Sequence, residues 1–189
     1  MIRTFIAVEV SPEVKRRARQ WIEALQRAAI QARWVDPESM HITLQFLGNV
    51  QAELIPQICQ HVAAAVKPLE AFDVTCTDLG AFPSWHRPRV LWLGIGSGYE
   101  ELVALQSSVE QSLKSLGYRG ETRRFEPHLT LGRLRTPTAI PDATLARIRQ
   151  AFAARSAVSF DVSEVVVFSS QLTRQGPIYE AMGRAELGG

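Results

Sequence analysis

Two short segments of the chain carry the same pattern, in which a histidine and a threonine are separated by one apolar residue and followed by leucine. They are His41–Leu44 and His128–Leu131, and they contain two of the four histidines in the sequence. An imidazole can give or take a proton near neutral pH, and a hydroxyl can donate a hydrogen bond to an anionic oxygen. The paired pattern therefore predicts proton-transfer chemistry on a bound anion.

Each motif lies in a short apolar run that is typical of a β-strand, MHITLQFLG in the first case and PHLTLGRL in the second. Side chains alternate between the two faces of a strand, so His41 shares a face with Thr43, and His128 shares a face with Thr130. Apolar residues fill the opposite faces. If the two strands face each other, two imidazoles and two hydroxyls surround one small site.

The surroundings of the two motifs indicate an internal duplication. The segment Phe72–Ser84 resembles Phe160–Leu172. The offset between matching residues is 88 at the start of these segments, 87 for the two histidines, and 86 for Phe82 and Phe168. A period this long excludes a solenoid and favours two similar lobes related by a pseudo-twofold axis. The alternative is that both matches reflect ordinary strand composition.

Apolar periodicity predicts helices over residues 12–30, 52–66, 99–116 and 141–154. Strands are predicted over residues 3–10, 33–35, 40–48, 72–82, 90–95, 125–134, 158–168 and 178–184. Strands and helices mix irregularly, which favours an α+β fold with antiparallel sheets. We expect one bilobal domain over residues 1–189, with two pseudo-symmetric lobes. Each lobe is an antiparallel sheet with helices on its outer face, and the active-site cleft lies between the sheets.

Composition limits the classes of protein to which the chain can belong. Its 189 residues are 46% hydrophobic and 21% charged, as in an ordinary globular protein. The net charge of +2 excludes a strong overall field toward nucleic acid or anionic lipid. Cys59 and Cys76 lack metal-binding spacing, which favours a reduced, cytoplasmic protein. We find no signal peptide and no membrane span, and expect no membrane partner.

The residues favour phosphodiester cleavage without a metal ion, in which one imidazole takes a proton from water and the other protonates the departing oxygen. The H-x-T spacing does not suit metal ligands, so we expect no metal site. No serine stands in a G-x-S-x-G setting. The glycines at 94, 96 and 98 lack the spacing of a dinucleotide-binding loop, so we expect no cofactor.

The motifs and the segments around them resemble a known family. The segments RTFIAVEV, RWVDPESMHITLQFLGNV, FPSWHRPRVLWLG, FEPHLTLGRL and SSQLTRQGPIYEAMGR are similar to those of the bacterial and archaeal RNA 2′,3′-cyclic phosphodiesterases, also called 2′-5′ RNA ligase-like proteins. These belong to the 2H phosphoesterase superfamily. The resemblance runs from about residue 2 to residue 186. The paired motifs alone indicate only the superfamily, and the flanking segments indicate the narrower group.

The resemblance implies hydrolysis of a 2′,3′-cyclic phosphate to a 2′-phosphomonoester. It makes His41 the proton donor to the leaving 3′ oxygen and His128 the proton acceptor that activates water. Thr43 and Thr130 would hold phosphate oxygens, and Arg133 would contact the phosphate or the base. Strict alternation places Arg133 on the face opposite His128, so this last role requires a bulge or a strand end.

Aromatic residues near the motifs could stack on a base, namely Phe125, Phe82 and Trp85, or could pack in the core or in a loop. The implied partner is RNA with a 2′,3′-cyclic phosphate end, or a cyclic nucleotide. No obligate protein partner is evident, and a monomer is expected. Two alternative functions stay open: a reversible 2′-5′ RNA ligase, and a protein that binds RNA ends or nucleotides without catalysis.

Overall fold

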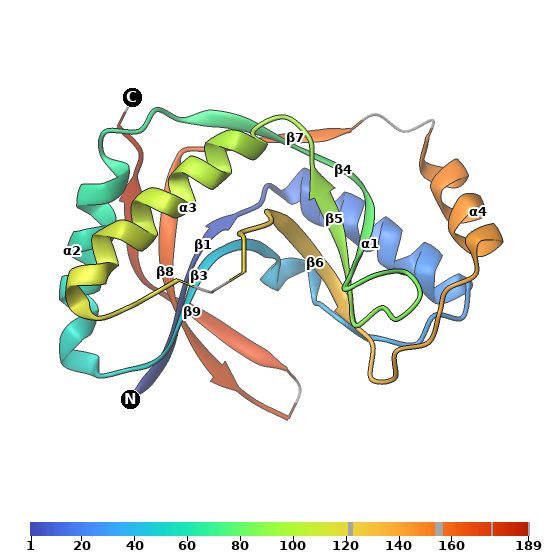
Figure 1. The fold of residues 1–189 in the computed structure, drawn as a ribbon, viewed down its shortest axis with the longest axis horizontal. Helices are drawn as coiled ribbons and strands as arrows, with labels where there is room; N and C mark the ends of the chain where they lie inside the picture. The colour runs from blue at the N-terminus through green and yellow to red at the C-terminus, as the bar shows by residue number, and fades with distance from the viewer. Residues whose placement is uncertain (121–122, 154–156, 175, 189) are drawn as a thin grey trace.

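The computed structural model describes residues 1–120, 123–153, 157–174 and 176–188 and shows two antiparallel sheets with helices outside them (Figure 1). The four-stranded sheet has the order β3-β1-β8-β9 and the five-stranded sheet has the order β2-β6-β5-β4-β7. The strands are β1 (Ile2–Glu9), β2 (Arg33–Trp34), β3 (His41–Val50), β4 (Phe72–Phe82), β5 (Val90–Ile95), β6 (His128–Arg133), β7 (Val158–Val162), β8 (Glu164–Leu172) and β9 (Pro177–Glu186). The predicted α+β class is confirmed.

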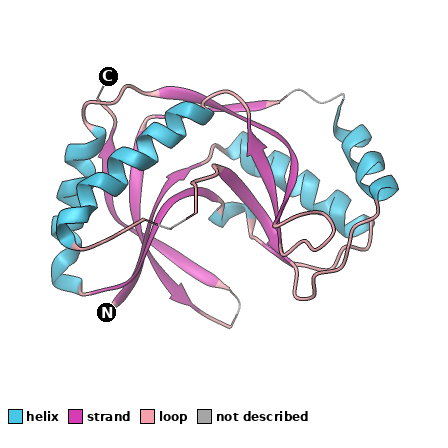
Figure 2. Ribbon diagram, viewed as in Figure 1, coloured by secondary structure: helices cyan, strands magenta, loops and turns pink. Residues whose placement is uncertain are grey.

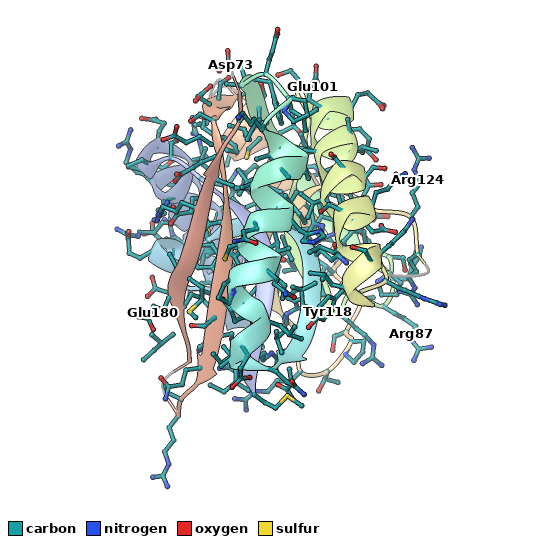
Figure 3. The ribbon with its side chains drawn as sticks, turned by 90° about the vertical axis from the view of Figure 1, so that its left-hand side faces the viewer. Asp73, Arg87, Glu101, Tyr118, Arg124 and Glu180 are labelled. Atoms are coloured by element: carbon teal, nitrogen blue, oxygen red, sulfur yellow. The ribbon has the colours of Figure 1, made fainter. Side chains whose placement is uncertain are left out.

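Helices lie on the outer sides of both sheets (Figure 2). The helices are α1 (Pro12–Arg27), α2 (Ile55–Val66), α3 (Tyr99–Leu113) and α4 (Asp142–Ala153). Helices α2 and α3 pack on each other and on the four-stranded sheet, as Figure 3 shows from that side. Helix α1 packs on β6 and β7, and Arg149 of α4 donates to the Leu79 carbonyl of β4 over 3.1 Å. The predicted histidine motifs on β3 and β6 therefore lie on the sheet faces that the helices do not cover.

The two sheets share a strand pattern that supports the predicted duplication. Strands β3-β1-β8 and β6-β5-β4 follow each other in the same spatial order, with antiparallel neighbours in both sheets. The two similar segments meet directly, because Asp73 of β4 pairs with Asp161 of β7 and the residues on either side pair around them. The halves also exchange elements. Helix α1 from the first half covers the five-stranded sheet, and α3 from the second half covers the four-stranded sheet.

One strand prediction is wrong in an informative way. The sequence predicts a single strand over residues 158–168, but the structure has β7 in the five-stranded sheet and β8 in the four-stranded sheet, separated at Ser163. Residues 158–162 alternate between buried apolar and exposed polar side chains, and residues 165–168 are apolar and buried. No glycine, proline or other turn signal stands between the two parts, so the sequence does not reveal the change of sheet. The predicted helices begin within three residues of the observed ones. The last residue of the predicted fourth helix, Ala154, lies outside the described residues.

Helix α1, which packs on the strand that carries His128, shows how the local sequence sets the start and the buried face of a helix. The Ser11 hydroxyl accepts a hydrogen bond from the Val14 amide at 3.3 Å, and Pro12 occupies the first turn. The buried side chains recur at helical spacing and form one apolar stripe: Val14, Ala18, Trp21, Ile22 and Leu25. This stripe joins the main core under the five-stranded sheet. No helix in the described part of the chain is long and apolar enough to cross a bilayer.

Candidate active site

The two predicted histidines occupy the same place in their strands and make the same hydrogen bond. His41 is the first residue of β3, and its Nδ1 lies 2.9 Å from the Ser39 carbonyl oxygen. His128 is the first residue of β6, and its Nδ1 lies 2.6 Å from the Glu126 carbonyl oxygen. A carbonyl oxygen can only accept, so Nδ1 carries the proton in both rings. In the neutral ring, Nε2 is therefore the proton acceptor, and the carbonyl fixes the ring's orientation.

Aromatic rings surround His41. The His41 ring centroid lies 4.7 Å from that of Phe5, 5.2 Å from that of Tyr179 in an edge-on arrangement, and 6.1 Å from that of Phe168. Burial lowers the pKa of His41, and the Ser39 carbonyl and the negative charge of Glu9 oppose this effect. The neutral imidazole is therefore favoured in the free protein.

His128 has a matching aromatic pair. The Phe82 ring lies edge-on to it with centroids 5.0 Å apart, and the Trp92 centroid lies 5.9 Å away. Phe82 is the duplication partner of Phe168, so equivalent positions of the two halves contact the two histidines. The Trp92 ring also depends on Gly80, its partner across β4 and β5, because a Cβ at position 80 would lie 2.3 Å from the indole. Each histidine is thus held by a backbone carbonyl and by aromatic rings, three for His41 and two for His128.

The two threonines lie where alternation predicts. Thr43 is half-buried on β3 and pairs with Ala7 of β1. Thr130 is half-buried on β6 and pairs with Trp92 of β5. Each hydroxyl is therefore on the face of its own histidine, as predicted.

Strict alternation does not hold as far as Arg133, because β6 contains a bulge of the kind that its predicted role requires. Thr130 pairs with Trp92, whereas Gly132 pairs with Leu91, so Leu131 is an extra residue in β6. The extra residue resets the alternation and brings Arg133 to the face of His128 and Thr130. An equivalent bulge in β3 leaves Leu44 as the extra residue and turns Phe46 to the face of His41.

Tyr179 of β9 connects the two sheets electrostatically. Burial raises the pKa of Tyr179, and the positive charges of Arg133, Arg3 and Arg33 oppose this rise. The ring of Tyr179 also contacts His41. Arg33 and Arg133 belong to the five-stranded sheet, where they pair across β2 and β6. Strands β3 and β6 are also in contact (Figure 1). The strands that carry the two histidines are thus neighbours, and charges of the five-stranded sheet act on a ring that contacts His41.

Other predicted residues lie away from these contacts. Phe125 is half-buried against the main core. Trp85 is covered by the Arg149 guanidinium, 5.5 Å from its ring centroid. His61 Nδ1 lies 2.7 Å from the Ser112 carbonyl and joins α2 to α3, which is a structural role. Among the described residues, no three His, Cys, Asp or Glu side chains are grouped so that they could hold a metal ion.

Sequence reasoning missed four residues that contact the histidines: Phe5, Trp92, Phe168 and Tyr179. Two of them could have been found from the duplication. Phe168 matches Phe82 at an offset of 86, and Trp92 lies 87 residues after Phe5. Tyr179 carried no such signal, because only the pairing of β9 with β8 brings it to His41.

Comparisons with known proteins show the family to which the chain is similar. The family model of the 2′-5′ RNA ligase superfamily matches residues 12–174. The chain is 34% identical to an RNA 2′,3′-cyclic phosphodiesterase of Thermotoga maritima, over 100% of this chain and 97% of the relative. It is 34% identical to a protein of the same name from Aeropyrum pernix, over 85% and 89% of the two chains.

Solved structures share the fold. TT0787 of Thermus thermophilus superposes with a TM-score of 0.81 at 22% identity, over 100% of this chain and 99% of that chain. Escherichia coli LigT, solved in complex with 3′-AMP, superposes with a TM-score of 0.75 at 25% identity, over 98% of both chains. The paired motifs, the two matching sheets and the extent of these matches show that the chain belongs to the 2′-5′ RNA ligase superfamily, as its sequence predicts.

Proposed function

We propose that this protein is an RNA 2′,3′-cyclic phosphodiesterase, with His41 as proton donor and His128 as proton acceptor. The observation that carries the proposal is the repeated histidine geometry. Both rings begin a strand, both donate from Nδ1 to the carbonyl two residues earlier, and their strands contact each other. The relatives that match nearly the whole chain bear the same enzyme name.

The reaction needs one proton removed and one supplied. Water attacks phosphorus as its proton moves to Nε2 of His128, and the bond between phosphorus and O3′ breaks. The proton of Nε2 on His41 goes to O3′, which leaves a 3′-hydroxyl and a 2′-phosphomonoester. Each such transfer contributes about 10²–10⁴ in rate. Before the next turnover, His128 releases its extra proton to solvent and His41 takes one up, which restores both rings. The proposed chemistry uses no metal ion or cofactor.

The neighbouring residues supply charge and orientation. The hydroxyls of Thr43 and Thr130 donate to the non-bridging phosphate oxygens, and the Arg133 guanidinium compensates the developing negative charge. Phe82, which lies edge-on to His128, is the proposed stacking residue for the terminal base. Phe125 remains a predicted second stacking residue.

The test is hydrolysis of 2′,3′-cyclic AMP in the presence of a chelator, with the product identified by phosphorus NMR. We expect turnover that survives chelation and yields only 2′-AMP. His41→Ala and His128→Ala should each lower kcat by about 10²–10⁴. His61→Ala is the matched control, because that histidine joins two helices, and it should retain activity. Normal turnover in either motif variant would refute the two-histidine mechanism.

The family model also favours a second candidate function, reversible 2′-5′ ligation, since its name describes RNA ligases. The same two histidines would act in reverse, and the 2′,3′-cyclic end would be attacked by a 5′-hydroxyl end instead of water. Joining of such ends at high RNA concentration would support ligation. Binding of both ends without turnover would instead identify a non-catalytic binding protein.

We further propose that the chain acts as a monomeric, single bilobal domain over residues 1–189, in the cytoplasm. The halves exchange helices and strands, so neither lobe is made from one continuous segment. Cys59 and Cys76 are both unpaired, which suits a reducing compartment. Sedimentation velocity tests the monomer, and fractionation of cells tests the location.

A further inference from the structure

A small cavity lies next to the aromatic neighbours of His41 and has no part in the proposed chemistry. Its volume is about 220 Å³, and its lining combines a cation, aromatic rings, a hydroxyl and an amide: Arg3, Thr4, Phe5, Phe46, Gly48 and Asn49. Phe5 connects this cavity to the candidate active site, because its ring lies between His41 at 4.7 Å and Phe46 at 6.0 Å. The ring of Phe5 thus separates the cavity from His41.

Phe46 is a large apolar residue that folding does not bury. Its side chain is 52% exposed, although the apolar residues on the helix-covered face of the same strand are buried. The bulge at Leu44 turns it outward, at the position that corresponds to Arg133 in the second motif. Phe46 is therefore exposed at the position where the other half of the chain carries the Arg133 guanidinium. Such a position suits contact with a ligand better than packing in the core.

Arg3 provides positive charge at the same cavity. It is exposed, pairs with Asn49 across β1 and β3, and forms no ion pair with any described residue. The charge of Arg3, like that of Arg133, opposes the rise in the pKa of Tyr179. The ring of Tyr179 contacts His41. Arginine side chains therefore stand both at the end of the second motif and at this cavity.

We propose that the Arg3–Phe46–Asn49 cavity binds the nucleotide that precedes the cyclic end of an RNA strand. This inference rests on the proposed function and names its substrate class, an RNA end of at least two nucleotides. The base stacks on Phe46, the Asn49 amide contacts the edge of that base, and Arg3 binds the phosphate that joins the two nucleotides. Aromatic stacking with a nearby cation is the usual way in which proteins hold single-stranded RNA.

The test compares kcat/KM for 2′,3′-cyclic AMP with kcat/KM for the dinucleotide ApA that ends in a 2′,3′-cyclic phosphate. We expect the wild-type protein to prefer the dinucleotide. Phe46→Ala should reduce that preference about tenfold, mainly through KM. Arg3→Gln should reduce it to a similar extent and lower the slope of log kcat/KM against log salt by about one for the dinucleotide.

Arg135→Gln is the matched control, since Arg135 is an exposed arginine that lines a different cavity, formed by the segments that follow α1 and β6. It should keep the dinucleotide preference. Loss of the preference in Arg135→Gln but not in Arg3→Gln would show that RNA takes the other path and would overturn the inference. An equal loss for both substrates in Phe46→Ala would place the terminal base in the cavity and would also overturn it.

A wild-type protein that hydrolyses both substrates equally well would overturn this inference and leave the proposed function intact. A protein that hydrolyses neither substrate would instead contradict the proposed function. Circular dichroism of each variant checks that the fold is kept. Phe46 and Arg3 are exposed, so both replacements should leave the free energy of unfolding within about 0.5 kcal/mol of the wild-type value.

Discussion

The two histidines share a sequence context but differ in what surrounds them. His41 contacts three aromatic rings, one of them from the last strand of the chain, whereas His128 contacts two. Burial lowers the pKa of His41, which disfavours the charged imidazole that a proton donor needs. An anionic phosphate beside the ring favours the charged form. In the proposed mechanism, binding of the anionic substrate therefore favours the protonated form of His41, which is the form that acts as the proton donor.

This coupling predicts that the pKa of His41 depends on the ligand. In the free protein His41 should titrate below 6.5, and binding of 2′-AMP should raise its pKa. NMR of the imidazole protons measures both values, with the signal assigned from His41→Gln. Correspondingly, the alkaline limb of kcat should lie at higher pH than that of kcat/KM, because the latter reports the free enzyme. A pKa of His41 that 2′-AMP leaves unchanged would contradict its role as the acid.

A second prediction concerns Gln45, the residue after the bulge in the first motif. Its side chain is 95% buried on the core face of β3, and neither amide atom has a hydrogen-bond partner among the described residues. Burying an unpaired polar group costs about 1–3 kcal/mol. Gln45→Met should therefore raise the free energy of unfolding by about 1 kcal/mol, measured in urea. Gln57→Met on the exposed side of α2 is the control, and a decrease in Gln45→Met would show that the amide has a partner.

Strands and their bulges, rather than single residues, decide which side chains reach the site. The bulges after Thr43 and Thr130 each add one residue and turn Phe46 and Arg133 to the histidine face. Close approach between β4 and β5 also matters. The Trp92 ring lies over Gly80, where a Cβ would come within 2.3 Å of it, and also contacts His128 and Phe82.

Gly80→Ala should therefore affect both stability and catalysis. The added methyl group forces the Trp92 ring to move, which should cost about 1–3 kcal/mol of the free energy of unfolding. It should also lower kcat on 2′,3′-cyclic AMP, because the ring supports His128. Adding Trp92→Leu should recover part of the stability, judged against Trp92→Leu alone. If Gly80→Ala has wild-type stability and activity, the indole is not fixed by the glycine.

At the scale of the whole molecule, the two lobes depend on each other for their elements. Strand β4 of the first half is part of the five-stranded sheet, and helix α1 of the same half packs on that sheet. Strand β8 of the second half is part of the four-stranded sheet, and helix α3 packs on that sheet. One core cluster contains residues of both sheets and all four helices. This exchange keeps the histidine-bearing strands β3 and β6 in contact and so maintains the candidate site.

The exchange predicts that both lobes unfold together. Tryptophan fluorescence and far-ultraviolet circular dichroism should give the same urea midpoint, as expected for a cooperative two-state transition. The fragments 1–86 and 87–189 should each fail to fold alone, because each lacks a helix and a strand that its sheet needs. Two separate transitions, or a folded fragment, would mean that the lobes are independent domains.

The sequence by itself determined the local features of this protein. The repeated motif, the strand alternation that pairs each histidine with its threonine, and the capped start of α1 all follow from nearest neighbours and periodicity. These features were enough to predict the α+β class, the two lobes and the family. They depend on interactions within a few residues, which a linear pattern records.

Only the tertiary structure decided which distant residues meet. The bulge that turns Arg133 toward His128, the change of sheet at Ser163, and the approach of Tyr179 to His41 depend on pairing between strands far apart in sequence. A bulge is an extra residue relative to a partner strand, so it does not exist until that partner is present. Periodicity cannot record the partner, and for that reason the surroundings of the histidines had to come from the fold.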